Sequence, residues 1–314
     1  MKKSNSKKNS ISSLCILWLA LLAASILFVY PSFTNALAEI EQATSIGGFE
    51  SSLNGMDEEE LEREKERVRA YNKKIAQAQV ITPFTYQGAT LTDDEYESLL
   101  SSDVANGNIM CVVDIPSINV YLPVAHGTSD AILAYEAGHM YGTSLPLGGE
   151  TTHGIIAAHT GLPTARLFSD VKTMKKGDEF RIHVLDEIHR YEVVDINIVP
   201  QGDEEPQYMQ IEAEKDYITL YTCSPNGVNT HRIMVKGERR YPDIPRDGEG
   251  GDNTSVRRNK IALIKTILFA AIPISVWIIG VTQIAKAIKE EKQRRRNLKA
   301  SQKAQLDQEN NTKE

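Results

Sequence analysis

Cysteine is scarce in this chain, which has only Cys15, Cys111 and Cys223 among 314 residues. So few cysteines exclude the disulfide framework that stabilises many small secreted proteins. Cys15 lies in a long apolar run, and Cys111 lies in the β-type run Ile109–Ile115, where it is interpreted as a small apolar core residue. Cys223 is therefore the candidate for a reactive thiol.

The central part of the chain also lacks positive charge. Residues 14–256 contain 18 Lys and Arg against 37 Asp and Glu, a net charge of −19, whereas the whole chain carries −7. An acidic surface repels a phosphate backbone, which excludes nucleic acid as a partner class. The histidines show no metal-ligand spacing with cysteine or acidic residues, and no internal repeat is present. We therefore expect neither a metal nor another cofactor.

Two long apolar runs are present. Residues 14–30 follow the lysine-rich residues 2–8, an order typical of a cleaved signal peptide or a signal anchor. Residues 266–285 are long enough to cross a bilayer, and basic residues follow them up to Arg294–Arg296. Basic residues at both outer flanks predict a plasma-membrane protein with cytoplasmic termini and an extracellular middle.

The rest of the chain divides by pattern. From Asp57 to about Gln77, acidic residues precede basic ones with pairs at helical spacing, which predicts a helix. Thr92–Glu95 is typical of the cap of a short helix that ends near Leu100. The predicted order is a basic cytoplasmic N-terminus (1–13), a membrane helix (14–30), a juxtamembrane linker (31–56), an N-terminal helix with a loop region (57–105), a β-rich domain (106–242), a linker (243–265), a second membrane helix (266–285) and a basic cytoplasmic tail (286–314). The hydrophilic residues 293–314 are predicted to be disordered.

Short β-type runs separated by turn residues begin at Ile109. The predicted strands are Ile109–Ile115, Val120–Val124, Ile155–Ala158, Glu179–Leu185, Arg190–Val199, Tyr217–Thr222 and Arg232–Lys236. The predicted helical inserts are Ala131–Tyr135, Pro163–Asp170 and Glu204–Ile211. Many short strands with few helices predict a mostly β fold, a closed or nearly closed barrel.

The stretch Tyr217–Glu238 places a cysteine and an arginine at adjoining strand ends. Cys223 ends one β-type run, Arg232 starts the next, and a turn-rich loop, Ser224-Pro225-Asn226-Gly227, joins the two runs. A thiol beside a fixed cation indicates a cysteine nucleophile with an oxyanion or substrate clamp. Such a nucleophile needs a histidine to share its proton, and His159 ends another short apolar run in the same way.

These motifs resemble those of the sortases, the membrane-bound cysteine transpeptidases of Gram-positive bacteria. The shared residues are Thr222-Cys223, Arg232 nine positions later, and Ala158-His159-Thr-Gly-Leu-Pro163. The fuller match is to the pilus-assembling class C, through Gly227–Arg232 and Gly138–Pro146, and the resemblance covers roughly residues 71–240. It implies an eight-stranded sortase β-barrel at 106–242, flanked by the N-terminal helix, a lid-like loop and the two membrane helices.

The resemblance implies a role for each motif residue. Cys223 is the expected nucleophile, His159 the expected acid and base, and Arg232 the expected clamp on the oxyanion or the substrate backbone. Thr222 and Asn229 adjoin them and are candidates for the wall of the substrate groove. His139 lies in a family-like motif and is interpreted as structural, whereas a strand would turn His231 away from Arg232.

The segment Thr82-Pro83-Phe84 departs from the family pattern. Sortases of the pilus class often carry a lid whose tip reads Asp-Pro-aromatic, in which the Asp pairs with the catalytic Arg and the aromatic ring covers the Cys. Here Thr82 replaces the acid, so an ion pair with Arg232 cannot form. The hypothesis is a loosely held lid in which Phe84 shields Cys223. The alternative is a loop that only connects the helix to the barrel.

The resemblance also implies an activity. The enzyme is expected to cleave a Leu-Pro-X-Thr-Gly-like sorting signal of a pilin between Thr and Gly through a thioacyl intermediate on Cys223. The lysine amine of another pilin then resolves the intermediate as an isopeptide bond. The first alternative is a sortase that anchors proteins to the cell wall, with a peptidoglycan-precursor amine as acceptor. The second is a non-catalytic scaffold that binds pilins.

Overall fold

The computed structural model describes residues 3–78, 93–101, 109–202, 204–245 and 254–311. The chain forms two compact units: residues 34–263, and residues 1–33 together with 264–314. The second unit consists of the first part of helix α1 (Lys3–Leu53) and most of helix α5 (Thr254–Asn311). Within the described ranges, the helical stretches Ile11–Leu53 and Lys260–Gln305 are long and apolar enough to cross a membrane, judged by length and composition alone.

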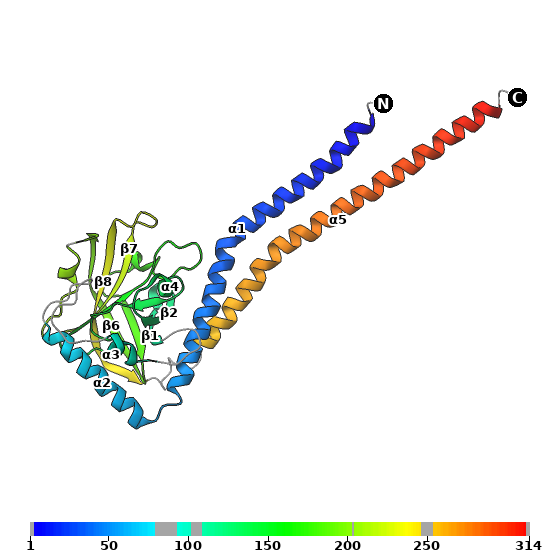
Figure 1. The fold of residues 1–314 in the computed structure, drawn as a ribbon. Helices are drawn as coiled ribbons and strands as arrows, with labels where there is room; N and C mark the ends of the chain where they lie inside the picture. The colour runs from blue at the N-terminus through cyan, green and yellow to red at the C-terminus, as the bar shows by residue number, and fades with distance from the viewer. Residues whose placement is uncertain (1–2, 79–92, 102–108, 203, 246–253, 312–314) are drawn as a thin grey trace. The chain divides into compact units, whose positions relative to one another are not determined.

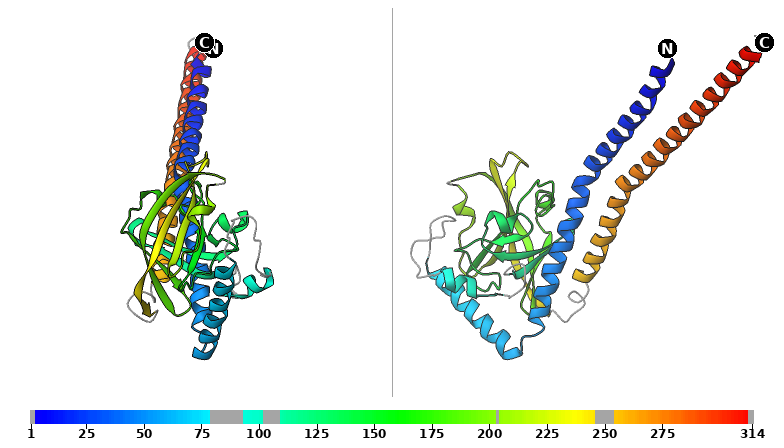
Figure 2. Two further views of the ribbon diagram at one scale, coloured as in Figure 1. Left: turned by 90° about the vertical axis from the view of Figure 1, so that its left-hand side faces the viewer. Right: turned by 45° about the vertical axis from the view of Figure 1, so that its right-hand side comes forward.

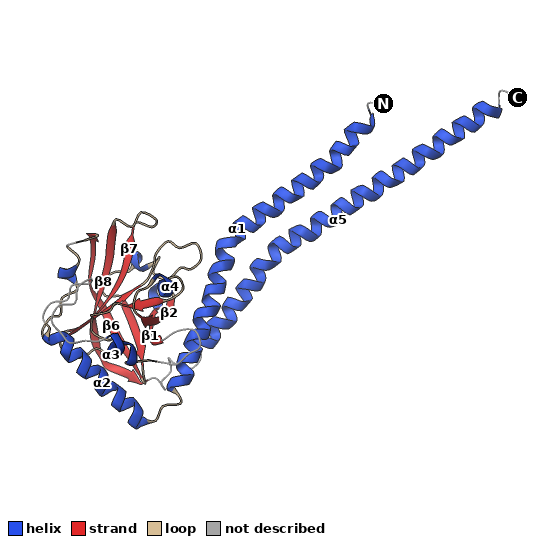
Figure 3. Ribbon diagram, in the orientation of Figure 1, coloured by secondary structure: helices blue, strands red, loops and turns tan. Residues whose placement is uncertain are grey.

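A closed β-barrel forms the centre of the 34–263 unit (Figures 1 and 3). Its strands are β1 (Ile109–Ile115), β2 (Val120–His126), β3 (Ala137–His139), β4 (Thr152–Ala157), β5 (Glu179–Val184), β6 (Glu187–Pro200), β7 (Asp216–Ser224) and β8 (His231–Pro245). Their order around the barrel is β1-β2-β3-β4-β7-β8-β6-β5, and β5 pairs with β1 to close it. The β2–β3 and β4–β7 pairs are parallel. The predicted mostly β barrel is confirmed.

Successive side chains along β7 and β8 point alternately into the barrel and to its outer face. Leu220 of β7 and Val235 of β8 belong to the main core, so side chains one residue away point outward. There a second, smaller apolar cluster forms from Met140, Ile155, Val199, Met209 and Met234. Met209 comes from the connection between β6 and β7, which therefore covers part of the outer face.

Helix α2 (Glu58–Gln77) begins at the predicted place, because Asp57 and Glu60 form a reciprocal capping box. It packs beside the barrel (Figure 2), where the Asn72 side-chain amide donates to the Leu145 and Gly148 carbonyls. The remaining short elements are α3 (Asp93–Ser98), α4 (Asp130–Leu133) and the 3₁₀ turns η1 (Pro116–Ile118), η2 (Val171–Thr173) and η3 (Pro206–Tyr208).

The predicted linker 31–56 is helical as far as Leu53. Its small and apolar residues Ala43, Ile46, Phe49 and Leu53 follow one another at intervals of three or four, and all four are buried. These four residues form one buried face of the helix. The neighbouring Gly and Ser residues obscured this helical pattern in the sequence. The tail 293–314, predicted as disordered, is helical to Asn311, since it contains good helix formers and no Pro or Gly.

Two predicted helical inserts are wrong. Residues 163–170 form turns, because Leu167 has a left-handed backbone (φ 40°) and the Phe168 amide bonds the His159 carbonyl instead of a helical partner. Of residues 204–211, only the 3₁₀ turn η3 is helical. Strand β3 was missed, because Ala-Gly-His offers no alternation of apolar and polar residues.

Candidate active site

Cys223 and Arg232 face each other across the end of the β7–β8 hairpin. The antiparallel register pairs Cys223 directly with Arg232, so both side chains lie on the outer face. Both residues are half-buried. The connecting turn needs left-handed backbone at Gly227 (φ 78°) and Asn229 (φ 59°), residue types that accept this conformation. The hairpin thus brings the predicted thiol and cation together.

The guanidinium of Arg232 is held on two sides. Its Nε donates to the Tyr221 hydroxyl at 2.8 Å. Its Nη1 donates to the carbonyls of Asn229 at 2.8 Å and His231 at 3.1 Å. Within the described part of the chain, Nη2 donates to no protein group. The described residues therefore engage Nε and Nη1 of this cation but not Nη2.

His159 follows strand β4, which runs parallel to β7. The ladder pairs Ala157 with Tyr221, and the Ala158 amide continues it by donating to the Tyr221 carbonyl. Extending the same register places His159 beside Cys223. The two segments also touch beyond the sheet, where the Thr160 hydroxyl bonds the Asn226 side chain at 3.0 Å.

Gly161 makes this approach feasible. Its backbone is left-handed (φ 72°), and a Cβ there would lie 2.8 Å from the Cβ of Asn226. The backbone of the loop that carries His159 therefore packs against the Asn226 side chain, which belongs to the turn after Cys223. Since all three motif residues are half-buried, the site is sheltered and still reachable from solvent.

The candidate groove residues behave differently from each other. Thr222 does not line a groove: it is 2 % exposed, and its hydroxyl donates to the Ala158 carbonyl at 2.7 Å. Strand alternation turns it inward, where it tethers the residue before His159. Asn229 is exposed in the turn, and its carbonyl bonds Arg232. Thr82, Pro83 and Phe84 lie outside the described residues, so the lid stays a prediction.

Two of the buried histidines, His139 and His153, have hydrogen-bond partners on both ring nitrogens. His139 lies between the Tyr96 hydroxyl and the Ser144 carbonyl, and burial lowers its pKa to about 4. His153 bonds the Gln210 carbonyl and the Thr219 hydroxyl, each at 2.8 Å, and burial lowers its pKa to about 4 as well. The structural interpretation of His139 fits this environment. Cys111 is fully buried in β1, and burial raises the pKa of its thiol.

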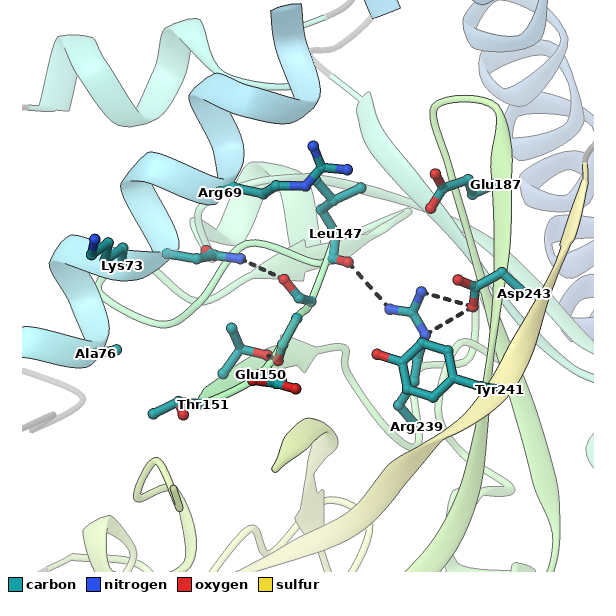
Figure 4. Close-up of a pocket in the computed structure, with 14 residues that line it drawn as sticks. Arg69, Lys73, Ala76, Leu147, Glu150, Thr151, Glu187, Arg239, Tyr241 and Asp243 are labelled. Carbon is teal, nitrogen blue, oxygen red and sulfur yellow. Dashed lines mark hydrogen bonds and ion pairs between the residues drawn. The ribbon is translucent and has the colours of Figure 1, made fainter. Parts of the chain in front are cut away.

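A separate cavity of about 530 Å³ lies where α2, the loop around Leu147 and strand β8 meet (Figure 4). Arg239 lines this cavity and donates hydrogen bonds to the Leu147 carbonyl and to Asp243. Glu187 and Asp243 line this cavity, and their carboxylates come within 4.8 Å of a ring nitrogen of the neighbouring His189. The sequence did not reveal this group, because the pairing of β6 with β8 creates it.

The Glu187–His189–Asp243 group does not need a metal for charge balance. Lys65 contacts Glu187 at 2.9 Å, and Arg239 contacts Asp243 at 2.8 Å. The bonds from His189 and Lys65 hold the pKa of Glu187 at about 2, although burial opposes this shift. Because protein cations already neutralise these carboxylates, we assign no metal site here.

Sequence reasoning missed two residues behind Arg232. Tyr221 lies two positions before Cys223 on the same strand face, a spacing that could have identified it. Its hydroxyl donates to Glu205 at 2.7 Å. Glu205 carries no such signal, because it comes from the hydrophilic stretch between β6 and β7.

Comparisons with known proteins agree on one family. The family model described as Sortase domain matches residues 113–240. The crystal structure of sortase C1 from Streptococcus agalactiae is 38 % identical, with a TM-score of 0.56, and the match covers 62 % of this chain and 96 % of that one. Sortase C from Streptococcus pneumoniae, a structure reported for catalysis and pilin substrate specificity, is 40 % identical, with a TM-score of 0.53 and coverage of 63 % and 96 %.

A more distant relative by sequence is Sortase A from Streptococcus agalactiae serotype III (strain NEM316). It is 24 % identical over 180 residues, which span 55 % of this chain and 70 % of the relative. The match to solved C-type structures is therefore both higher in identity and nearly complete over their length.

Proposed function

This chain belongs to the sortase family, as a class C cysteine transpeptidase, and from that membership we propose that it joins pilin subunits through isopeptide bonds. The observation that carries the proposal is the register that opposes Cys223 and Arg232 on a barrel shared with C-type sortases. The pilin as substrate is supported by the S. pneumoniae relative, which was studied for pilin specificity.

In the first half-reaction, the Cys223 thiolate attacks the threonine carbonyl of a Leu-Pro-X-Thr-Gly-like signal. The C–S bond forms, the C–N bond to glycine breaks, and His159 gives its proton to the leaving amine. In the second, a lysine amine of another pilin attacks the thioacyl carbon. His159 takes its proton, the C–S bond breaks and the thiolate returns.

Arg232 stabilises the negative charge that develops on the carbonyl oxygen, or holds the backbone of the signal. Its Nε and Nη1 are engaged by protein groups, so among the residues that the structure describes Nη2 is left as a donor for the substrate. A cation that is fixed before the substrate arrives needs little reorganisation in the transition state.

The two apolar helices would anchor the enzyme in the plasma membrane. Lysines precede the first, and basic residues up to Arg296 follow the second. In this topology the termini are cytoplasmic, and the barrel is extracellular, where sorting signals are exposed.

The test uses the full-length protein in detergent micelles with a purified pilin that bears the sorting signal. SDS-resistant ladders are expected, and they should vanish in Cys223→Ala. Cys111→Ala is the matched control, because it removes a buried thiol far from Arg232 in the sheet and should leave the ladder. Cleaved signal without a ladder, followed by product formation with a peptidoglycan-type amine, would favour wall anchoring. Ladders that persist in Cys223→Ala would overturn covalent catalysis and favour a scaffold.

A further inference from the structure

The hydroxyl of Tyr221 lies between a buried carboxylate and the guanidinium of Arg232. It donates to Glu205 Oε2 at 2.7 Å and accepts from Arg232 Nε at 2.8 Å. A phenolic hydroxyl has one proton and lone pairs that accept. Because its proton is committed to the carboxylate, a lone pair is left for the arginine. Because the Nε–H of Arg232 can only donate, the direction of both bonds is fixed.

Glu205 is an unusual residue to bury. It is 2 % exposed, and its other oxygen, Oε1, accepts from the Gly202 amide at 2.8 Å. In the described part of the chain, no Lys or Arg side chain bonds this carboxylate directly. A buried charge is costly without compensation. Along this hydrogen-bond network the cation that Glu205 reaches, through one intervening hydroxyl, is Arg232.

The network also fixes the plane of the guanidinium. Nε is bound to Tyr221, and Nη1 is bound to the backbone of the turn that follows Cys223. Bonds at two of the three nitrogens leave little rotation for the third. Burial and the bond to Glu205 raise the pKa of Tyr221, so the hydroxyl keeps its proton and its role as donor.

We propose that Glu205 and Tyr221 are positioning residues that hold Arg232 in its substrate-binding orientation. Through them the β6–β7 connection, residues 201–215, is coupled to the active site. This inference rests on the role of Arg232 in the proposed function. It predicts that a substrate or partner that displaces the β6–β7 connection also changes the rate of acylation.

The same strand offers a matched control. Tyr217 lies four residues before Tyr221 on the same face of β7, and its hydroxyl donates to Glu212 Oε2 at 3.2 Å. Both tyrosines therefore anchor the β6–β7 connection through a carboxylate, but only Tyr221 touches Arg232. If anchoring of the β6–β7 connection matters for cleavage, Tyr217→Phe and Tyr221→Phe should both slow it. If positioning of Arg232 matters, only Tyr221→Phe should slow it.

The experiment measures cleavage of a Leu-Pro-X-Thr-Gly-type peptide and single-turnover thioacyl formation by mass spectrometry, with full-length protein in detergent. Tyr221→Phe should lower kcat/KM about 10-fold, and Glu205→Gln should lower it to a similar extent or less, since one charge-assisted hydrogen bond is lost or weakened. Tyr217→Phe should change it less than about 2-fold. The alkylation rate of Cys223 by iodoacetamide should stay unchanged in all three variants.

A double-mutant cycle separates the possible failures. In an Arg232→Lys background, Tyr221→Phe should have almost no further effect, because residues that act through one another are not additive. Full additivity, or equal losses in Tyr217→Phe and Tyr221→Phe, would overturn the positioning role and leave the proposed function intact. If Arg232→Lys itself did not slow acylation, the role of Arg232 would fail, and the positioning role would fail with it.

Discussion

Two of the three arginines on strand β8, Arg232 and Arg239, show how one residue type has different environments in one barrel. Arg232 and Arg239 are seven positions apart, so alternation turns them to opposite faces of the strand. Arg232 is half-buried on the outer face, with Nη2 unengaged among the described residues. The Arg239 side chain is 5 % exposed, and it lies between the rings of Tyr191 and Tyr241.

The partners of Arg239 account for this difference. Its nitrogens bond the Leu147 carbonyl, Asp216 and Asp243. Asp216 in turn accepts from the Gly149 amide and the Tyr191 hydroxyl. Every guanidinium nitrogen of Arg239 thus bonds its own protein, and in this sense the side chain is saturated. The engagement of the third nitrogen, Nη2, and burial separate Arg239 from Arg232, the arginine proposed to bind the substrate.

The largest effect should follow from truncation of the unsaturated arginine. Arg232→Ala should lower kcat/KM for sorting-signal cleavage by about 1000-fold, because a fixed donor to the developing oxyanion is lost. Its unfolding free energy should fall by less than about 2 kcal/mol, because Arg232 is half-buried and reaches the buried Glu205 only through the Tyr221 hydroxyl. Peptide kinetics and urea unfolding of the same preparation would test both statements. A stability loss as large as the one expected for Arg239→Ala would erase the distinction.

Truncation of Arg239, the saturated arginine, should lower stability and leave the rate of cleavage almost unchanged. Arg239→Ala leaves the carboxylates of Asp216 and Asp243 without their cation, which should lower the unfolding free energy by about 4 kcal/mol. The rate per folded molecule should remain within about 2-fold of the wild type. Active-site titration of Cys223 before the kinetics gives the folded fraction. A rate that fell in the titrated fraction would mean that this end of the barrel also acts on catalysis.

A pH series tests the energetic effect of a buried and fully hydrogen-bonded histidine, His153, which lies at the start of β4, at the other end of the strand from His159. The pKa of His153 is lowered to about 4 in the folded protein, and its unfolded value is about 6.5. Below pH 6.5 the unfolded chain binds the proton more readily, so the contribution of His153 to stability should fall by about 3 kcal/mol as pH drops from 6.5 towards 4. His153→Gln keeps a donor and an acceptor but does not titrate. It should remove this contribution from the slope in urea unfolding between pH 7 and 4.5, while the contribution of His139, whose pKa is also lowered to about 4, remains.

Much of this arrangement follows from local sequence. The hairpin that opposes Cys223 and Arg232 could be predicted because two β-type runs flank a short turn that contains Asn-Gly. His159 could be predicted as the end of a third run. The barrel followed from many short strands with few helices. These features depend on residues close together in the chain, which is where alternation and turn chemistry carry information.

The rest depends on long-range contacts that one sequence does not encode in a pattern. Glu205 lies in a polar stretch that resembles a surface segment, and only the fold brings it under Tyr221. The group of Glu187, His189 and Asp243 exists because β6 pairs with β8. Thr222 was predicted to line the substrate groove, but the alternation of side chains along β7 places it on the inner face of the strand, where it is buried.

The smallest effect should come from a pair that adjoins the Arg239 network in sequence. Lys215 and Glu238 precede Asp216 and Arg239 by one residue each, and their charged atoms lie 2.7 Å apart. One residue along a strand reverses the face, so this pair is on the outer side, where the Lys215 side chain is 43 % exposed. Solvent screens such a pair, and Lys215→Ala should cost less than about 0.5 kcal/mol in urea unfolding. A cost near that of Arg239→Ala would show that sequence position, and not burial with saturated partners, sets the energy of these contacts.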